Sequence, residues 1–143
     1  MELPKSGEVA HEDSIDSEVS NQIFSEYSCK SLPKELMSDL SSHPSKIAES
    51  NLLNGIDMPH LDYDCSVVKQ CGLHNHVSDL QCEGVLYASM RHQQWFPSLG
   101  EGKPKKRAGF FLGDGAGVGK GRQLAGIILL AGCRGIKKHI WCS

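Results

Sequence analysis

The feature that most constrains this 143-residue sequence is a glycine-rich loop set between two apolar segments. Residues 108–113, AGFFLG, form a short apolar run rich in aromatic residues, which predicts a buried strand. The loop DGAGVGKG follows, and residues 122–131 then place apolar side chains at helical spacing. HIWCS at 139–143 looks like the opening of a second strand. The order strand, loop, helix, strand predicts a βαβ unit, the building block of a parallel sheet.

A loop in this position can cradle a phosphate group. Backbone N–H groups converge where a strand turns into a helix, and the helix N-terminus adds about half a unit of positive charge. Glycines adopt positive φ and let the backbone wrap closely, and a lysine at the helix start reaches the β and γ phosphates. The sequence therefore predicts a nucleotide-binding site made of Asp114, Gly115, Ala116, Gly117, Val118, Gly119, Lys120, Gly121 and Arg122.

Other glycine fingerprints fit this loop less well. The dinucleotide-binding pattern Gly-x-Gly-x-x-Gly fits in no register, since its last position falls on Val118, Lys120 or Arg122. The full Walker A form requires an initial glycine and a final Ser or Thr, where this sequence has Asp114 and Gly121. The hydroxyl that normally contacts Mg²⁺ is therefore missing. The alternative to a phosphate site is a glycine-rich turn that binds nothing.

A second helix is predicted over residues 79–94. Ser78 and Gln81 form a Ser-x-x-Gln capping box, and apolar residues behind it repeat at helical spacing until Pro97 ends the pattern. The preceding residues, 43–77, are predicted to be an extended and irregular lead-in, because their prolines disfavour helix.

Charge is distributed unevenly along the chain. Residues 1–42 hold nine acidic residues and three lysines, whereas the rest holds eight acidic and twelve basic residues. The Ser- and Glu-rich segment 1–42 cannot bury much apolar surface, which predicts a disordered acidic tail with a weak amphipathic patch at 23–27. The predicted fold class is α/β: an incomplete P-loop, recA-like parallel-sheet lobe at 78–143, truncated after its second strand begins and preceded by the lead-in and the tail.

A short basic run has three interpretations that the sequence leaves open. It fits a nuclear-import signal, a phosphate-contacting patch or a solvated turn. The run consists of Lys103, Lys105, Lys106 and Arg107.

No metal site and no membrane contact are predicted. Three cysteines and two histidines cluster in the sequence without a Cys-x2-Cys knuckle, a poor match to structural zinc sites. They are Cys65, Cys71, His74, His76 and Cys82. The longest apolar stretch, 124–133, is too short to span a bilayer.

Residues 109–128, GFFLGDGAGVGKGRQLAGII, closely resemble the P-loop of the strawberry notch family. That family carries Gly-Lys-Gly-Arg where most superfamily 2 helicases carry Gly-Lys-Thr, and Asp114 matches the helicase pattern Asp-x-x-Gly-x-Gly-Lys. Three further matches extend the resemblance over roughly residues 43–143. They are HPSKIAESNLL (43–53), DLQCEGVLYASMRHQQ (79–94) and HIWCS (139–143).

The resemblance implies a nuclear, helicase-like ATPase region of a large protein that acts in transcriptional and chromatin regulation. ATP and Mg²⁺ are the implied cofactors. Chromatin or nucleic acid and transcription regulators are the implied partners. Gln81 takes the position of the glutamine that reads adenine in these helicases. Capping its own helix is the competing role, and sequence spacing does not separate the two.

Hydrolysis requires a carboxylate for Mg²⁺ and a residue that orients water, but no Asp or Glu follows Asp114. We therefore expect this sequence to be an N-terminal part of a longer ATPase and to be inactive alone, with no catalytic residue of its own. The alternative is a non-catalytic nucleotide-binding scaffold or a transcriptional co-regulator interaction module. A nucleotide kinase is disfavoured, because its P-loop would lie near the N-terminus.

Overall fold

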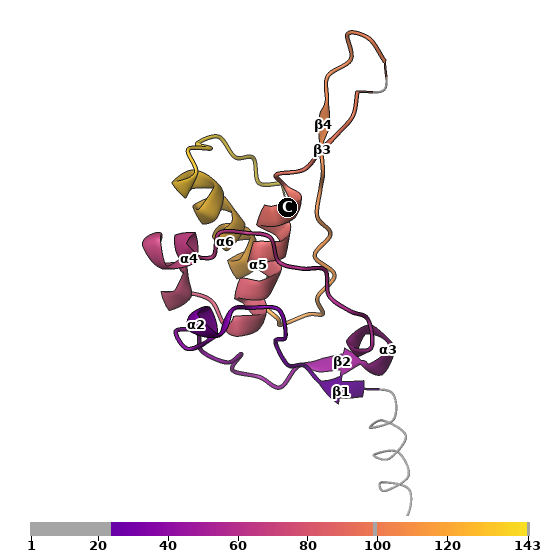
Figure 1. Cartoon of the computed structure of the whole chain (residues 1–143). Coiled ribbons are helices and arrows are strands. Elements are labelled where there is room, and N and C mark those ends of the chain that lie inside the picture. The colour runs from indigo at the N-terminus through magenta and orange to yellow at the C-terminus, as the bar shows by residue number, and fades with distance from the viewer. Residues whose placement is uncertain (1–23, 99, 143) are drawn as a thin grey trace, which may run out of the picture. The chain divides into compact units, whose positions relative to one another are not determined.

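The computed structural model describes residues 24–98 and 100–142, which divide into two compact units. Of the described residues, the smaller unit contains 24–27 and 46–57, and the larger unit contains 28–45 and 58–142. Figure 1 follows the chain through both units, each of which is described separately below.

The smaller unit is a two-stranded antiparallel sheet followed by a single helical turn. Strand β1 (Phe24–Glu26) pairs with β2 (Ala48–Ser50), so that Ser25 lies opposite Glu49. Helix α3 (Asn51–Asn54) follows β2 directly, and its Asn54 amide donates to Ser25 Oγ at 3.1 Å. This hydrogen bond ties the turn back to the first strand.

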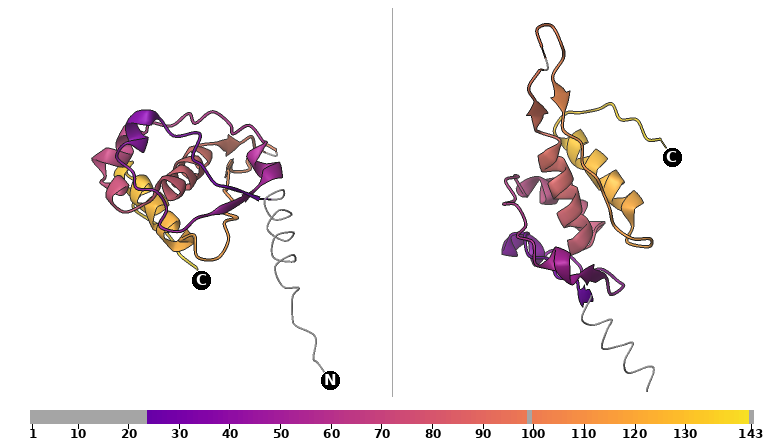
Figure 2. Two further views of the ribbon diagram at one scale, coloured as in Figure 1. Left: turned by 90° about the horizontal axis from the view of Figure 1, so that it is seen from below. Right: turned by 90° about the vertical axis from the view of Figure 1, so that its right-hand side faces the viewer.

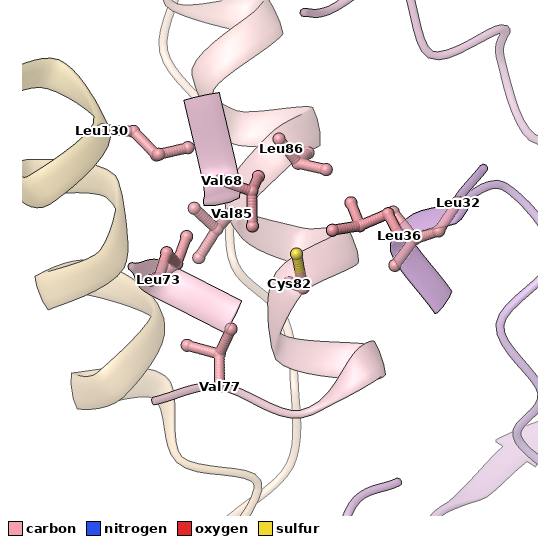
Figure 3. Close-up of a cluster of buried hydrophobic side chains, with 9 residues drawn as sticks. All are labelled: Leu32, Leu36, Val68, Leu73, Val77, Cys82, Val85, Leu86 and Leu130. Carbon is pink, nitrogen blue, oxygen red and sulfur yellow. The ribbon is translucent and has the colours of Figure 1, made fainter. Parts of the chain in front are cut away.

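The larger unit is organised around two helices, α5 (Asp79–Arg91) and α6 (Lys120–Cys133), which lie side by side (Figures 1 and 2). Three shorter elements cover one side of the pair: α2 (Lys34–Met37), α4 (Ser66–Gln70) and the 3₁₀ helix η1 (Leu73–Asn75). Their apolar side chains meet those of the helix pair in one core (Figure 3). Its buried members are Leu32, Leu36, Val68, Leu73, Val77, Cys82, Val85, Leu86 and Leu130.

Glycines let α5 and α6 approach closely. A Cβ built on Gly126 of α6 would lie 2.9 Å from Val85 Cγ2 and 3.2 Å from Leu73 Cδ1, closer than side chains normally pack. On the facing helix, a Cβ built on Gly84 would collide with the Oε1 atom of Gln123. The contact between the helices therefore depends on small residues on both sides, and Val85 fills the space over Gly126.

The helix predicted over 79–94 is confirmed as α5. Ser78 Oγ accepts from the backbone N–H of Gln81 at 3.4 Å, and Gln81 Oε1 accepts from the Ser78 N–H at 3.2 Å, which makes the predicted capping box. The helix ends at Arg91, a few residues before the predicted boundary. The helix predicted over 122–131 is also present, and α6 extends it at both ends.

The prediction of two strands for the βαβ unit is wrong, because neither segment forms a strand in this structure. Residues 108–113 are extended but pair with no strand, and Phe111 is 88% exposed. Residues 139–142 are also unpaired, and Ile140 is 92% exposed. A strand forms only where a neighbour accepts and donates its backbone hydrogen bonds, and no described segment does so here.

The described sheets are both antiparallel pairs, so the predicted parallel sheet is not seen. The second pair consists of β3 (Trp95–Phe96) and β4 (Lys106–Arg107), which form a hairpin after α5. This hairpin was not predicted, because the intervening polar residues read as a loop. The described residues form a mixture of helices and small sheets.

The prediction of a disordered tail is wrong for residues 24–42, and residues 1–23 lie outside the described residues. Strand β1 and helix α2 occur there, and Leu32 and Leu36 are buried in the core. The lead-in 43–77 likewise contains short helices rather than only extended chain. Elements of four or five residues are too short to produce a detectable periodicity, and in the larger unit Leu36 of α2 and Val68 of α4 are buried by packing into the core.

No helix in the described residues combines the length and apolar character needed to span a membrane.

Candidate nucleotide-phosphate site

The glycine-rich loop joins the extended segment 108–113 to helix α6, and two of its glycines have left-handed backbone. Gly117 has φ +85° and Gly119 has φ +86°. Side chains other than glycine rarely adopt this conformation, so both positions require glycine. Gly119 is the N-cap of α6, and its carbonyl accepts from the N–H groups of Arg122 at 2.9 Å and Gln123 at 3.2 Å.

Lys120 is the first residue of α6, and its ammonium group crosses the loop. Its Nζ donates to the carbonyl oxygens of Asp114 and Gly115, both at 2.7 Å. The N–H groups of Lys120 and Gly121 open the helix and have no acceptor within it. A cation, two backbone donors and the positive end of the helix dipole therefore gather in one place, which is the arrangement that binds an anion.

The loop leaves open space beside its backbone. A Cβ built on Gly115, Gly117 or Gly121 would have no heavy atom within 4 Å, leaving out its chain neighbours. An anion can therefore reach the main chain of the loop without displacing a side chain. The other predicted residues divide by burial: Ala116 and Arg122 are exposed, Asp114, Gly119 and Lys120 are half-buried, and Val118 is buried.

Gln123 is a residue of this site that sequence analysis missed. It is fully buried, and its Nε2 donates to Asp114 Oδ2 at 2.5 Å. Its Oε1 finds no hydrogen-bond partner among the described residues. The amide therefore fastens the start of the loop to the first turn of α6. A polar residue among the apolar positions of the predicted helix 122–131 was the signal in the sequence.

Gln81 connects α5 to the loop. Its side chain is 3% exposed, its Oε1 completes the capping box, and its Nε2 donates to the carbonyl oxygen of Val118 at 2.8 Å. A Cβ on Gly119 would lie 2.5 Å from that same Nε2. The capping role is confirmed, and the hydrogen bond to Val118 also fixes the position of the loop relative to α5. Contact between Gln81 and adenine stays a prediction.

The described residues contain no group of three or more His, Cys, Asp or Glu side chains placed to hold a metal ion. Burial is the main reason that the pKa of the Cys82 thiol is raised to about 12, and burial also raises the pKa values of Cys65 and Cys71.

The basic run lies outside the loop. Two of its members, Lys106 and Arg107, form strand β4, where they stand opposite Phe96 and Trp95. All four residues of the run are exposed. The structure therefore places these cations on the hairpin, and the predicted site residues from 114 to 122 lie together in the loop and first turn of α6.

Comparison of the sequence with known proteins places this chain in a family. Residues 42–143 match the model of the family described as P-loop containing NTP hydrolase pore-1. The chain is 40% identical over 101 residues to human protein strawberry notch homolog 2, which covers 71% of the chain and 7% of that relative. It is 38% identical over 122 residues to the Caenorhabditis elegans strawberry notch homolog, covering 85% of the chain and 6% of the relative. No solved structure matches the chain significantly.

A plant protein shows the same relationship: protein FORGETTER 1 of Arabidopsis thaliana is 41% identical over 101 residues, which span 71% of this chain and 7% of that protein. The resemblance to the strawberry notch proteins is therefore confirmed, and the chain corresponds to a small part of the length of these relatives.

Proposed function

Because the chain belongs to the P-loop containing NTP hydrolase pore-1 family and its named relatives are strawberry notch proteins, we propose that residues 114–122 bind the phosphates of ATP. Lys120 contacts the β and γ phosphates, and the N–H groups that open α6 donate to the same oxygens. Gln81 holds the loop through Val118 and approaches the adenine from α5.

The position of the Lys120 ammonium carries this proposal. Its Nζ donates to two loop carbonyls at 2.7 Å, so it is held against a loop whose glycines leave open space beside the backbone. Carbonyl oxygens are weaker partners for a cation than phosphate oxygens are. An entering phosphate can therefore replace these two contacts with stronger ones without moving the helix.

Replacing Lys120 tests the site. We expect Lys120→Ala to lower the affinity for ATP by about tenfold to a hundredfold, since a charge-assisted hydrogen bond contributes about 1.5–3 kcal/mol. Isothermal titration of the purified protein with ATP measures this. Lys137→Ala is the matched control, because it removes the same charge from an exposed position beyond the end of α6. Equal ATP affinity in all three proteins would remove the phosphate-site proposal.

The residues present do not by themselves form a Mg²⁺ site. Gly121 has no hydroxyl where related loops place one, and the Asp114 carboxylate accepts from Gln123. When bound, Mg²⁺ would neutralise charge on the β and γ phosphates. The positive charge that this chain itself places near the loop comes from the side chains of Lys120 and Arg122, both in the first turn of α6.

Measuring ATP hydrolysis distinguishes two versions of the proposed function, an ATPase and a nucleotide-binding scaffold. A helicase-related ATPase must hydrolyse ATP, whereas a nucleotide-binding scaffold needs only to bind it. Residues 114–122 supply only the phosphate-binding part, which both versions require. Phosphate release by the purified protein, compared with Lys120→Ala, distinguishes the two.

We also propose, from the family resemblance, that the protein acts in the nucleus in transcriptional or chromatin regulation. The exposed basic residues of the hairpin support this proposal weakly. Cell fractionation that finds the protein only outside the nucleus would oppose it.

A further inference from the structure

A second pocket lies at the far end of the helix pair from the glycine loop. It has a volume of about 430 Å³ and is lined by residues of α5, α6, the hairpin and the segment after α6. Its α6 members begin at Ile127 and include Ala131. At 1.5 Å per residue, Ala131 lies about 16 Å along the helix axis from Lys120. The pocket is therefore separate from the proposed ATP site, and its volume is in the range of small-molecule sites.

The charge of this pocket has one sign. Arg107, Arg134 and Lys138 contribute three cations to its lining, and none of the described residues that line it is Asp or Glu. Burial and the neighbouring Arg107 guanidinium lower the pKa of His92, which also lines the pocket. The lining thus carries a net positive charge, which favours an anion, and Asp64 is an acidic group outside the lining that interacts with Arg134.

The pocket also contains buried hydroxyl groups with unused hydrogen-bonding capacity. Ser89 is only 9% exposed, and its Oγ has no hydrogen-bond partner among the described residues. The hydroxyl of Tyr63, another lining residue, is buried and equally without a partner in that part of the chain. Leaving a buried donor unpaired is unfavourable, so these two atoms indicate where a ligand oxygen would be stabilised.

Aromatic side chains give the pocket a second kind of surface. Trp95 on β3 is 60% exposed and borders the cavity, where it stands opposite Arg107 of β4. The Arg134 guanidinium lies over the Tyr63 ring, 5.3 Å from its centroid, and this contact holds it in place. A flat ring can therefore pack on Trp95 while an anionic group reaches the cations.

We propose that this pocket binds a small phosphomonoester carried on an aromatic ring. The phosphate oxygens accept from Arg107, Arg134 and Lys138, and from the Ser89 and Tyr63 hydroxyls. The concave shape and enclosed donors favour a small ligand over an extended strand, which would follow an open groove. This site does not depend on the proposed ATP-binding function.

Phenyl phosphate is the probe for this pocket, measured by isothermal titration with the purified protein. We expect Lys138→Gln to weaken its binding at least about tenfold, because a charge-assisted contact is lost. Lys137→Gln is the matched control, since it changes the same charge one residue away and does not line the pocket. Equal binding by the two variants would overturn the proposal.

Ser89→Ala separates ligand binding from folding. Removing an unpaired buried hydroxyl should leave the melting temperature equal or higher, yet it should weaken phenyl phosphate binding several-fold. Unchanged phenyl phosphate affinity in Ser89→Ala would show that the hydroxyl faces no ligand and would oppose the assigned geometry.

Two further measurements identify the source of the phosphate. Phenyl phosphate should bind Lys120→Ala as tightly as the unaltered protein, and loss of binding there would place the probe in the glycine loop and overturn the assignment. A single-stranded oligonucleotide that binds through Lys138 while phenyl phosphate does not would replace the small ligand with a nucleic-acid strand.

Discussion

Helix α6 and the two extended segments that flank it are all apolar in sequence, yet they differ in how deeply their largest apolar side chains are buried. Leu130 of α6 is fully buried, whereas Phe111 before the helix and Ile140 after it are 88% and 92% exposed. A helix satisfies its backbone hydrogen bonds within four residues, while a strand depends on a neighbour that can lie far away in sequence. This explains why α6 forms from local hydrogen bonds, whereas the two flanking segments pair with no strand among the described residues.

The largest expected difference is in the free energy of unfolding, between one substitution in α6 and one in the segment that follows it. Leu130→Ala should lower the free energy of unfolding by about 2–5 kcal/mol, because it leaves a cavity among Leu73, Val85 and their neighbours. Ile140→Ala should change it by less than about 0.5 kcal/mol, since the side chain is exposed. Urea denaturation of both variants measures the contrast. A loss above about 1.5 kcal/mol in Ile140→Ala would show that residues 139–142 are packed as a strand.

Substitution at Gly126 tests how closely the helix pair packs. Its added Cβ would meet Val85 and Leu73, so Gly126→Ala should destabilise the protein by about 1–3 kcal/mol through overpacking. Gly132 lies on the same helix with nothing within 4 Å of its Cβ position. Gly132→Ala should therefore stabilise the protein by up to about 1 kcal/mol. Thermal denaturation of the two variants should move in opposite directions, and shifts of the same sign would contradict the close contact.

The double role of Gln81 gives a smaller expected effect. Gln81→Glu keeps the acceptor that caps α5 but loses the donor to the Val118 carbonyl, which should cost about 1–2 kcal/mol. Gln70→Glu is the matched control, because Gln70 is exposed on α4 and makes only a surface hydrogen bond. Comparing ATP with GTP adds a second readout. If Gln81 reads adenine, the variant also loses any preference for ATP, and a kept preference leaves Gln81 with structural roles alone.

Features that depend on neighbouring residues could be predicted from the sequence, and features that depend on distant residues could not. The capping box of Ser78 and Gln81, the positive φ of glycines in the loop and the presence of a helix after the loop depend on neighbouring residues, and they were predictable. The link from Gln81 to Val118 and the burial of Leu32 and Leu36 depend on residues far apart in the chain. Gln123 was missed for two reasons. Its hydrogen-bond partner, Asp114, lies at the other end of the loop, and its side chain fits only because Gly84 on α5 has no side chain there.

An apolar pocket lies beside α6, and residues on both flanking segments line it. Phe110 and Leu112 come from the segment before the helix, and Ile140 and Trp141 come from the segment after it. The two flanking segments are therefore as apolar as α6, and they differ from it because their backbone groups find no strand to pair with among the described residues.

The last and smallest expected effect is at Gly121, in the first turn of α6. Its built Cβ would meet no atom within 4 Å, and its φ is not in the left-handed region, unlike Gly117 and Gly119. Gly121→Thr should therefore fold normally and gain a few tenths of a kcal/mol, since threonine favours a helix slightly more than glycine does. The new hydroxyl stands where related loops contact Mg²⁺.

We therefore expect ATP affinity in Gly121→Thr to stay within about threefold of the unaltered protein and to become more dependent on Mg²⁺. Titrations with and without Mg²⁺ measure both, and Gly119→Thr is the contrasting variant because its backbone has φ +86° and its Cβ would meet Gln81. Loss of ATP binding in Gly121→Thr under both conditions would mean that the open space beside Gly121 is needed by the phosphates themselves. Glycine would then be required at this position for close approach, as it is at Gly119 for backbone conformation, and the missing hydroxyl would follow from that requirement.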